Sequence, residues 1–86
     1  MKKVLIPSAL RSYTGQTWVT AEGATLAELL LYLDRQYPGF RFRMVDEQDR
    51  LRSHMRVFID SHAVHDLTHP LAGVDAVHIV QALSGG

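Results

Sequence analysis

The sequence ends in a pair of glycines, Gly85 and Gly86, which follow Ser84 and an apolar run that predicts a strand. Glycine has no β-carbon, so a Gly-Gly segment can lie extended in a narrow cleft. The carboxylate of Gly86 is then the group with chemistry, because a partner can convert it into an activated acyl derivative. This pattern favours a protein that other enzymes handle as a substrate. The alternative is an ordinary frayed chain end, where glycine is common.

A second group of residues with possible chemistry lies in the segment His-Ala-Val-His-Asp-Leu-Thr-His. His62, His65 and His69 could in principle gather imidazoles on a metal ion. More distant candidates for the same site are His54, Asp66 and His78. The segment is interpreted as a turn and a short strand beside Pro70, so no helix presents the ligands on one face. We therefore expect exposed polar residues and no metal site, with histidine titration near neutral pH able to tune docking.

Composition limits the class of protein. The 86 residues suffice for one domain with a single modest core. Nine basic and nine acidic side chains balance, so no global field attracts nucleic acid or an anionic membrane. No apolar run approaches the ~20 residues that span a bilayer. The short apolar stretch after Met1 contains Pro7 and is too brief for a signal peptide. We therefore expect a cytoplasmic protein with no membrane or nucleic-acid partner.

The chain has no cysteine. It can form no disulfide, iron–sulfur cluster or thiolate nucleophile, and it cannot carry sulfur as a side-chain persulfide. Any sulfur that it carried would have to sit on the terminus. The sequence also has no catalytic triad, phosphate-binding loop or paired-carboxylate motif. These features favour a protein that is not an enzyme.

Local patterns predict the elements that position these groups. Residues 3–9 and 18–20 are rich in β-prone side chains and predict two strands, with residues 11–16 as the hairpin turn between them. Thr25 then opens a helix. Glu28, three residues later, completes a capping box that satisfies backbone donors of the first turn.

The helix is amphipathic. Asp34 falls outside its apolar stripe, and Pro38-Gly39 ends the helix. The residues of the stripe are Leu26, Leu29, Leu30 and Leu33, with Tyr37 continuing it.

The second half of the chain predicts two more strands. Residues 41–54 carry many charges and predict a solvated connection with at most a short extended piece. Residues 56–60 and 76–83 predict strands, with a turn at residues 61–62 and a loop at residues 70–75 between them.

The order strand, strand, helix, strand, strand predicts an α+β roll, in which one helix packs across one face of a mixed sheet. This is the β-grasp plan. Here the chain resembles a known family, the ubiquitin-like sulfur carriers related to the small subunit of molybdopterin synthase and to the thiamine sulfur carrier. The segments that carry the resemblance are residues 25–30, 37–39, 56–60, 70–71 and 77–86.

Two local features refine this resemblance. Residues 46–52 are most similar to the branch that includes carriers for a cysteine synthase. Two turns depart from the family's pattern: Asp60-Ser61-His62 stands where an Asn-Gly turn is usual, and residues 73–77 replace a Gly-Asp-Glu-Val-like turn. Because both departures fall in turns, they bear on the partner more than on the fold.

The resemblance implies a two-stage chemistry at Gly86. An adenylating, E1-like enzyme would use ATP to join the carboxylate to AMP, and a sulfur donor or sulfurtransferase would displace AMP to leave a thiocarboxylate. A downstream biosynthetic enzyme would then take the sulfur. The protein itself would be a co-substrate that binds no cofactor. It would form one ubiquitin-like domain over residues 1–86, with residues 84–86 as a flexible tail.

Several residues are expected to meet these partners. Gly85 and Gly86 form the reacting end, Leu83 and Ser84 precede them, and Phe58 lies on a partner-facing sheet surface. Most other aromatic residues are expected in or near the core: Tyr13, Trp18, Tyr32, Phe40 and Phe42. The arginines between residues 41 and 56 are expected on a solvated surface, because acidic residues lie among them.

Two alternative functions stay open. A ubiquitin-like modifier would share the activation at Gly86 but would transfer the acyl group to a lysine amine. A non-covalent β-grasp interaction module would need no free Gly86. The sequence also leaves open the pathway (molybdopterin, cysteine, thiamine or siderophore-type thioacid synthesis), the sulfur donor and the oligomeric state.

Overall fold

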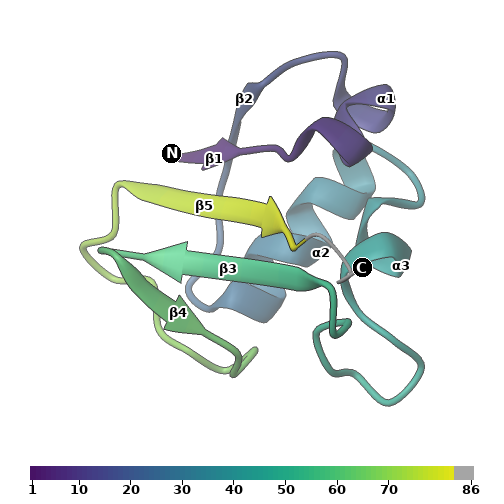
Figure 1. Cartoon of the computed structure of the whole chain (residues 1–86). Coiled ribbons are helices and arrows are strands. Elements are labelled where there is room, and N and C mark those ends of the chain that lie inside the picture. Colours follow the sequence, from purple (N-terminus) through teal and green to yellow (C-terminus); the bar gives the residue numbers. More distant parts are fainter. Residues whose placement is uncertain (83–86) are drawn as a thin grey trace.

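The computed structural model describes residues 1–82 of the chain. Its strands are β1 (Lys2–Leu5), β2 (Trp18–Ala21), β3 (Met55–Ile59), β4 (His62–Val64) and β5 (Ala76–Gln81). Its helices are the 3-10 helix η1 (Ser8–Leu10), α1 (Arg11–Thr14), α2 (Leu26–Gln36) and α3 (Phe40–Met44). None of the helices within residues 1–82 has the length and apolarity needed to cross a membrane. Figure 1 shows the helices gathered on one side of the sheet.

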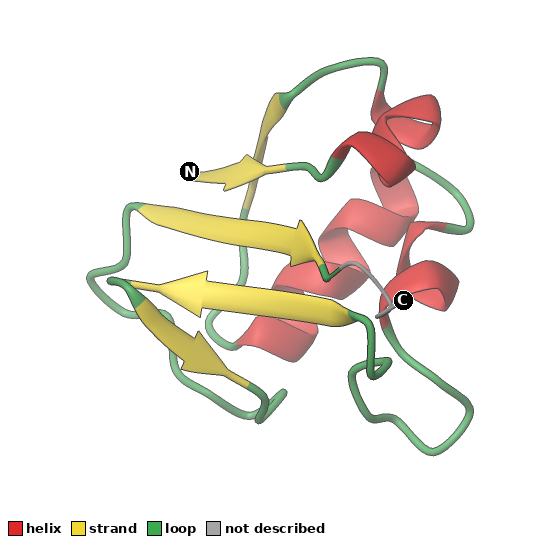
Figure 2. Cartoon of the chain, viewed as in Figure 1, coloured by secondary structure: helices red, strands yellow, loops and turns green. Residues whose placement is uncertain are grey.

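The strands form one mixed sheet in the order β2-β1-β5-β3-β4. β5 lies in the centre, parallel to β1 and antiparallel to β3. β2 pairs with β1 and β4 pairs with β3, both antiparallel, so β2 and β4 form the edges. One face of the sheet is covered by helices and the other is not (Figure 2). This arrangement confirms the α+β class and the β-grasp plan.

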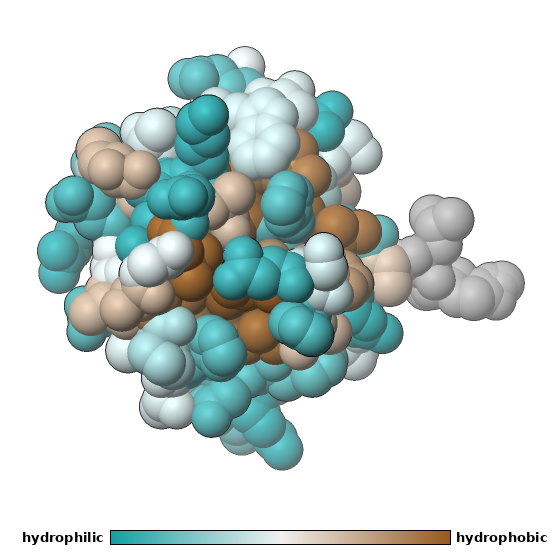
Figure 3. All heavy atoms as spheres, turned by 90° about the vertical axis from the view of Figure 1, so that its left-hand side faces the viewer, coloured by the Kyte–Doolittle hydropathy of each residue, from teal (hydrophilic) through white to brown (hydrophobic). Residues whose placement is uncertain are grey.

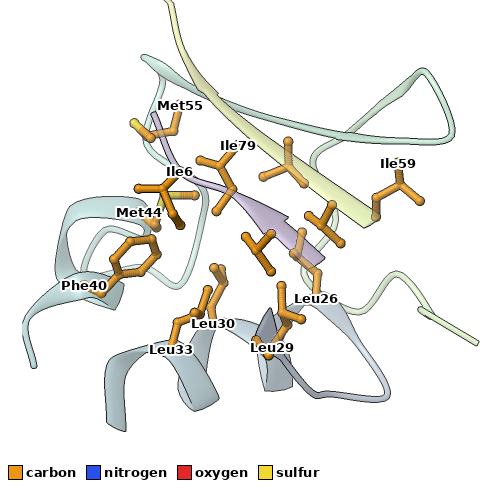
Figure 4. Close-up of a cluster of buried hydrophobic side chains, with 14 of the residues drawn as sticks. Ile6, Leu26, Leu29, Leu30, Leu33, Phe40, Met44, Met55, Ile59 and Ile79 are labelled. Atoms are coloured by element: carbon orange, nitrogen blue, oxygen red, sulfur yellow. The ribbon is translucent and has the colours of Figure 1, made fainter. Parts of the chain in front are cut away.

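The core lies between α2 and the inner face of the sheet. Figure 4 shows the leucines of α2 pointing toward Ile6 and Ile79. Val57 and Val77 are buried on the same inner face. The predicted apolar stripe is confirmed, since its leucines are fully buried: Leu26, Leu29, Leu30 and Leu33. Each buried leucine contributes roughly 1.5–3 kcal/mol, and Tyr37 packs against the core as a partly buried residue.

The predicted capping box forms at the start of α2. Thr25 Oγ1 accepts the N–H of Glu28 at 3.3 Å. Glu28 Oε1 accepts the N–H of Ala24 at 3.1 Å, one residue before the usual donor of such a box. The capping interaction therefore also fixes the loop that leads into the helix.

The predicted hairpin turn over residues 11–16 is wrong. β1 ends at Leu5, and the chain then forms η1 and α1 before Gly15 ends α1 with a left-handed backbone, φ 70°. The helical turns bring Leu10 into the core, where it is 2% exposed. Burial of this one side chain favours helix over an extended hairpin arm. Arg11 Nε donates to the carbonyl of Ile6 at 3.1 Å and ties the two segments together.

The predicted solvated connection over residues 41–54 is also wrong at its start. α3 forms there and buries Phe40 and Met44 completely. Asp34 of α2 helps to position α3, because its Oδ1 accepts the N–H groups of Gly39 at 3.2 Å and Arg41 at 3.1 Å. The residue lies outside the apolar stripe, as expected, but it has a structural role that the spacing does not reveal.

The turn between β3 and β4 departs from the family's sequence pattern but has a usual hairpin geometry. Asp60 and Ser61 have φ values of 51° and 68°, both in the left-handed region. Positive φ at both central residues is the signature of a type I′ hairpin turn, which Asn-Gly adopts most readily. The departure at Asp60-Ser61 therefore leaves the course of the chain unchanged and places moderate backbone strain in the turn.

The packing of α2 gives a stability prediction. Leu30→Ala should lower the free energy of unfolding by about 2–5 kcal/mol, because it leaves a cavity in the core. Leu31→Ala, on the same helix but 44% exposed, should change it by less than about 0.5 kcal/mol. Denaturant titration of both variants measures the difference. Equal losses would contradict the orientation of the helix.

Candidate functional site

β5 is the strand that leads to the C-terminal segment. Its Gln81 pairs with Met55 at the start of β3, and the N–H of Ala82 donates to the carbonyl of His54 at 2.7 Å. The base of the C-terminal segment is thus fixed beside the beginning of β3. Four of the predicted site residues lie outside the described residues, and their roles stay predictions: Leu83, Ser84, Gly85 and Gly86. The predicted flexible tail over residues 84–86 lies outside them as well.

The outward face of the sheet carries a row of side chains that crosses all five strands. Leu5 of β1 pairs with Trp18 on β2 and with His78 on β5. Phe58 of β3 pairs with His78 and with Ala63 on β4. Buried residues adjoin each of them along its strand, such as Val4, Val57 and Val77, so this row, here called the outward row, lies on the face opposite the helices.

The outward row combines aromatic and aliphatic groups with one imidazole. The rings of Trp18 and His78 meet edge to face, with 5.6 Å between their centroids. A hollow of about 600 Å³ is lined by Leu5, Phe58, His78 and Val80, with Asp60 and Asp75 among its polar residues. Such a mixture of apolar area and a polar rim is typical of a protein-binding surface.

Phe58 lies where the sequence predicted it, half-buried on the outward face of the sheet. Its contact with a partner stays a prediction. Figure 3 views the molecule from the side at the left of Figure 1 and shows hydrophobic atoms in the middle of that side, with hydrophilic residues around them. Apolar surface on this side is therefore bordered by hydrophilic residues.

Most of the aromatic residues were predicted in or near the core, and two of them lie on the surface instead. Trp18 is 44% exposed and Phe42 is 63% exposed. The guanidinium of Arg52 lies 4.9 Å from the centre of the Phe42 ring, and its Nε donates to the Phe42 carbonyl at 2.8 Å. Strand alternation in Trp18-Val19-Thr20 could have placed Trp18 outward, because Val19 is the buried residue. The other aromatic predictions are confirmed: Phe40 is buried, and Tyr13 and Tyr32 pack against the core.

The histidine-rich segment forms β4 and the loop after it. His62 begins β4, and Asp66 lies in the loop between His65 and His69. The Asp66 carboxylate accepts the Thr68 hydroxyl at 2.7 Å and the Thr68 N–H at 2.8 Å. These bonds hold the pKa of Asp66 below its ordinary value. Within residues 1–82, no three His, Asp or Glu side chains are grouped so that they could hold a metal ion.

The same loop caps α2. The Leu67 carbonyl accepts the N–H of Ala27 at 2.8 Å, and the His69 carbonyl accepts the N–H of Leu26 at 3.1 Å. Both donors belong to the first turn of the helix, where backbone N–H groups have no partner within the helix. The histidine-rich segment therefore stabilises α2 through its backbone.

This capping gives a prediction for Asp66. Asp66→Ala removes both bonds to Thr68, so the loop should loosen and the Leu26 and Ala27 amides should exchange severalfold faster with solvent. Asp75→Ala is the matched control, because within the described residues its exposed carboxylate makes no hydrogen bond. NMR-detected hydrogen exchange compares the two.

The pH dependence of the same loop follows from the lowered pKa of Asp66. A carboxylate whose pKa is lower in the folded state stabilises the fold fully at pH values above its pKa in the unfolded chain, about 3.9. This stabilisation is lost as the pH falls through the lower pKa of the folded state. The wild-type loop should therefore loosen only in strong acid. Unchanged protection of Leu26 and Ala27 in the Asp66→Ala variant would contradict the capping role.

Together these features define a ubiquitin-like β-grasp protein with an uncovered sheet face and a central strand that runs toward the C-terminus. The chain belongs to the ThiS family, whose family model matches residues 4–86. It is 32% identical over 89 residues to the sulfur carrier protein CysO of Mycobacterium tuberculosis, with 96% of each chain covered. The resemblance to sulfur carriers that the sequence indicated is confirmed.

Solved structures agree with this assignment. A chain of the Amycolatopsis orientalis BexX/CysO complex matches with a TM-score of 0.90 and 29% identity, covering 100% of both chains. Mycobacterium tuberculosis CysO matches with a TM-score of 0.89 and 29% identity, covering 96% of this chain and 100% of that one. SAMP1 from Haloferax volcanii, at 23% identity and a TM-score of 0.76, covers 99% of this chain and 98% of its own and supports the fold alone.

Proposed function

We propose that this chain is a sulfur carrier protein, a co-substrate whose Gly86 carboxylate is adenylated and then converted to a thiocarboxylate. The observation that carries the proposal is the similarity to a sulfur carrier along 96% of both chains, within a family match over residues 4–86. The proposed partners are an E1-like adenylating enzyme that uses ATP, and a sulfur donor or sulfurtransferase. The similarity to CysO favours an enzyme of cysteine biosynthesis as the downstream acceptor.

The proposed chemistry takes place in the partner's site. Adenylation turns a carboxylate oxygen that cannot leave into part of AMP, which can. A sulfur nucleophile then attacks the Gly86 carbonyl carbon, so a C–S bond forms while the C–O bond to AMP breaks. This chain supplies reach, because the four residues after Ala82 extend up to about 14 Å at about 3.5 Å per residue. It needs no general base of its own.

In this proposal the outward row is the docking surface. β5 contributes His78 to the row and then continues directly to Ala82, so a partner bound to the row is aligned with the reacting segment. Trp18 and Phe58 supply the aromatic area that interface hot spots favour. Leu83 and Ser84 would enter the mouth of the partner's cleft.

Changes at the terminus test the proposal. Deleting Gly86 should leave the melting temperature unchanged, because no core residue is touched, and should abolish the gain of sulfur. Adding an alanine after Gly86 should do the same, because it moves the carboxylate by about 3.5 Å from aligned attack. Gly85→Val should slow the reaction without abolishing it, since a β-branched residue is bulkier and stiffer.

The measurement is intact mass after incubation with the adenylating enzyme, ATP and a sulfur source. Full-length protein should exchange one oxygen for sulfur. A truncated chain that gains sulfur as readily would refute the role of Gly86. A protein adduct on lysine would instead indicate a modifier, and an unchanged terminus a non-covalent module.

The docking surface has its own prediction. Phe58→Ala should raise the KM of the adenylating enzyme for this protein roughly 5- to 30-fold with little change in kcat, as expected for loss of about 1–2 kcal/mol of binding. Leu31→Ala, an exposed apolar residue on the opposite side of the molecule, is the control. Steady-state kinetics on variants with matched melting temperatures compares them, and equal KM values would refute docking through Phe58.

A further inference from the structure

The side-chain amines of this chain are confined to one end of the sheet. The sequence contains two lysines, Lys2 and Lys3, and both lie on β1. β1 is parallel to β5, and Lys3 lies opposite Ala76, the first residue of β5. The C-terminal segment leaves the sheet at the other end of β5, after Gln81. The amines and the base of this segment are therefore separated by the whole length of a strand.

This separation is about equal to the greatest combined reach of the terminus and a lysine side chain. Residues 76 to 82 span roughly 20 Å at about 3.3 Å per residue. The four residues after Ala82 extend at most about 14 Å, and a lysine side chain extends about 6 Å. The Gly86 carbonyl and the amine of Lys3 could meet only with both segments fully extended and directed toward each other along the sheet. Lys2 lies one residue further away.

A basic side chain does lie at the base of the C-terminal segment, and it is an arginine. Arg56 pairs across the strands with Val80, two residues before Ala82. Its Nη1 donates to the backbone carbonyl of Ser53. This bond holds the guanidinium near His54, whose carbonyl accepts the N–H of Ala82. The guanidinium therefore lies beside Ala82, the last described residue before the C-terminal segment.

We propose that Arg56 keeps a positive charge at this position while excluding an amine that an activated Gly86 would acylate. A guanidinium stays protonated at all accessible pH values and is not a nucleophile, whereas a lysine amine has a reactive neutral fraction. The inference rests on the proposed function, because only an activated terminus is at risk. Lys2 and Lys3 lie far from the base of the chain's own C-terminal segment, and the terminus of a different molecule can reach them.

The reaction that Arg56 prevents is internal amide formation. A neutral amine at this position would attack the Gly86 carbonyl carbon, so a C–N bond forms, the bond to the leaving group breaks and the nitrogen loses a proton to solvent. The product is lighter than the free acid by one water. Acyl transfer to the imidazole of His54 would instead return the free acid on hydrolysis, so intact mass separates the two outcomes.

The test uses the full chain with a thioester installed on Gly86 by intein cleavage, so no adenylating enzyme is needed. Arg56→Lys places an amine at the base of the C-terminal segment and keeps the charge. Val80→Lys, at the partially exposed cross-strand neighbour of Arg56, is a second and independent variant. Arg35→Lys is the matched control, because Arg35 is exposed on α2, behind the sheet.

A tethered amine has an effective concentration of about 1 mM, so at about 10 µM protein the internal amide should form roughly a hundredfold faster than an intermolecular one. Arg56→Lys and Val80→Lys should accumulate the lighter product, linked to Gly86 in peptide maps, while wild type and Arg35→Lys should hydrolyse. Melting curves confirm that all variants are folded.

Two results would overturn the inference. One is that Arg56→Lys and Val80→Lys form no more internal amide than Arg35→Lys. The other is that wild type cyclises through Lys2 or Lys3. Failure of the proposed function is recognised in a separate experiment. In that case the wild type would gain no sulfur with the adenylating enzyme, and the result of the thioester experiment would not affect this conclusion.

Discussion

The contact between the leucine face of α2 and the inner face of the sheet is the interaction on which the rest of the structure depends. A chain of 86 residues hides only roughly 60% of the surface of its unfolded state, so it has no second core to compensate for a weak one. Once the inner face is covered by α2, the other face is left without a helix and β5 is held in the centre of the sheet. The packing that makes the fold stable therefore also determines which surface and which strand are available to a partner.

The parts of the fold that could be predicted are those whose local sequence pattern extends over enough residues to be recognised. Thr25 and Glu28 marked the start of α2, and the leucine spacing gave the buried face of the helix. α1 and α3 have four and five residues, which is too short for the helical periodicity of apolar residues to be recognised. In α3 the buried pair Phe40 and Met44 is separated by Arg41, Phe42 and Arg43, so charged side chains interrupt the apolar positions of the segment.

The candidate site divides in the same way. Phe58 was predicted on a sheet surface and lies on the outward face, and the Gly-Gly motif was visible in the sequence itself. The outward row was not, because it depends on the register between strands that are far apart in the sequence, such as Trp18 beside Leu5 and His78 beside Phe58. In the histidine-rich segment, the side chains raised the question of a metal site. The contribution of the segment to the fold comes instead from the backbone carbonyls of Leu67 and His69.

The position of β5 between two partner strands has a mechanical consequence. A pull on the chain beyond Ala82 acts along the axis of β5, parallel to its neighbours and at right angles to most of the hydrogen bonds that hold it. Under such a load the bonds to β1 and β3 share the force and must fail together, whereas an edge strand peeled from its end loses its bonds one at a time. A central strand with bonds on both sides is thus a firm anchor, and an enzyme that draws this segment into a cleft can pull hard on it while the domain stays folded.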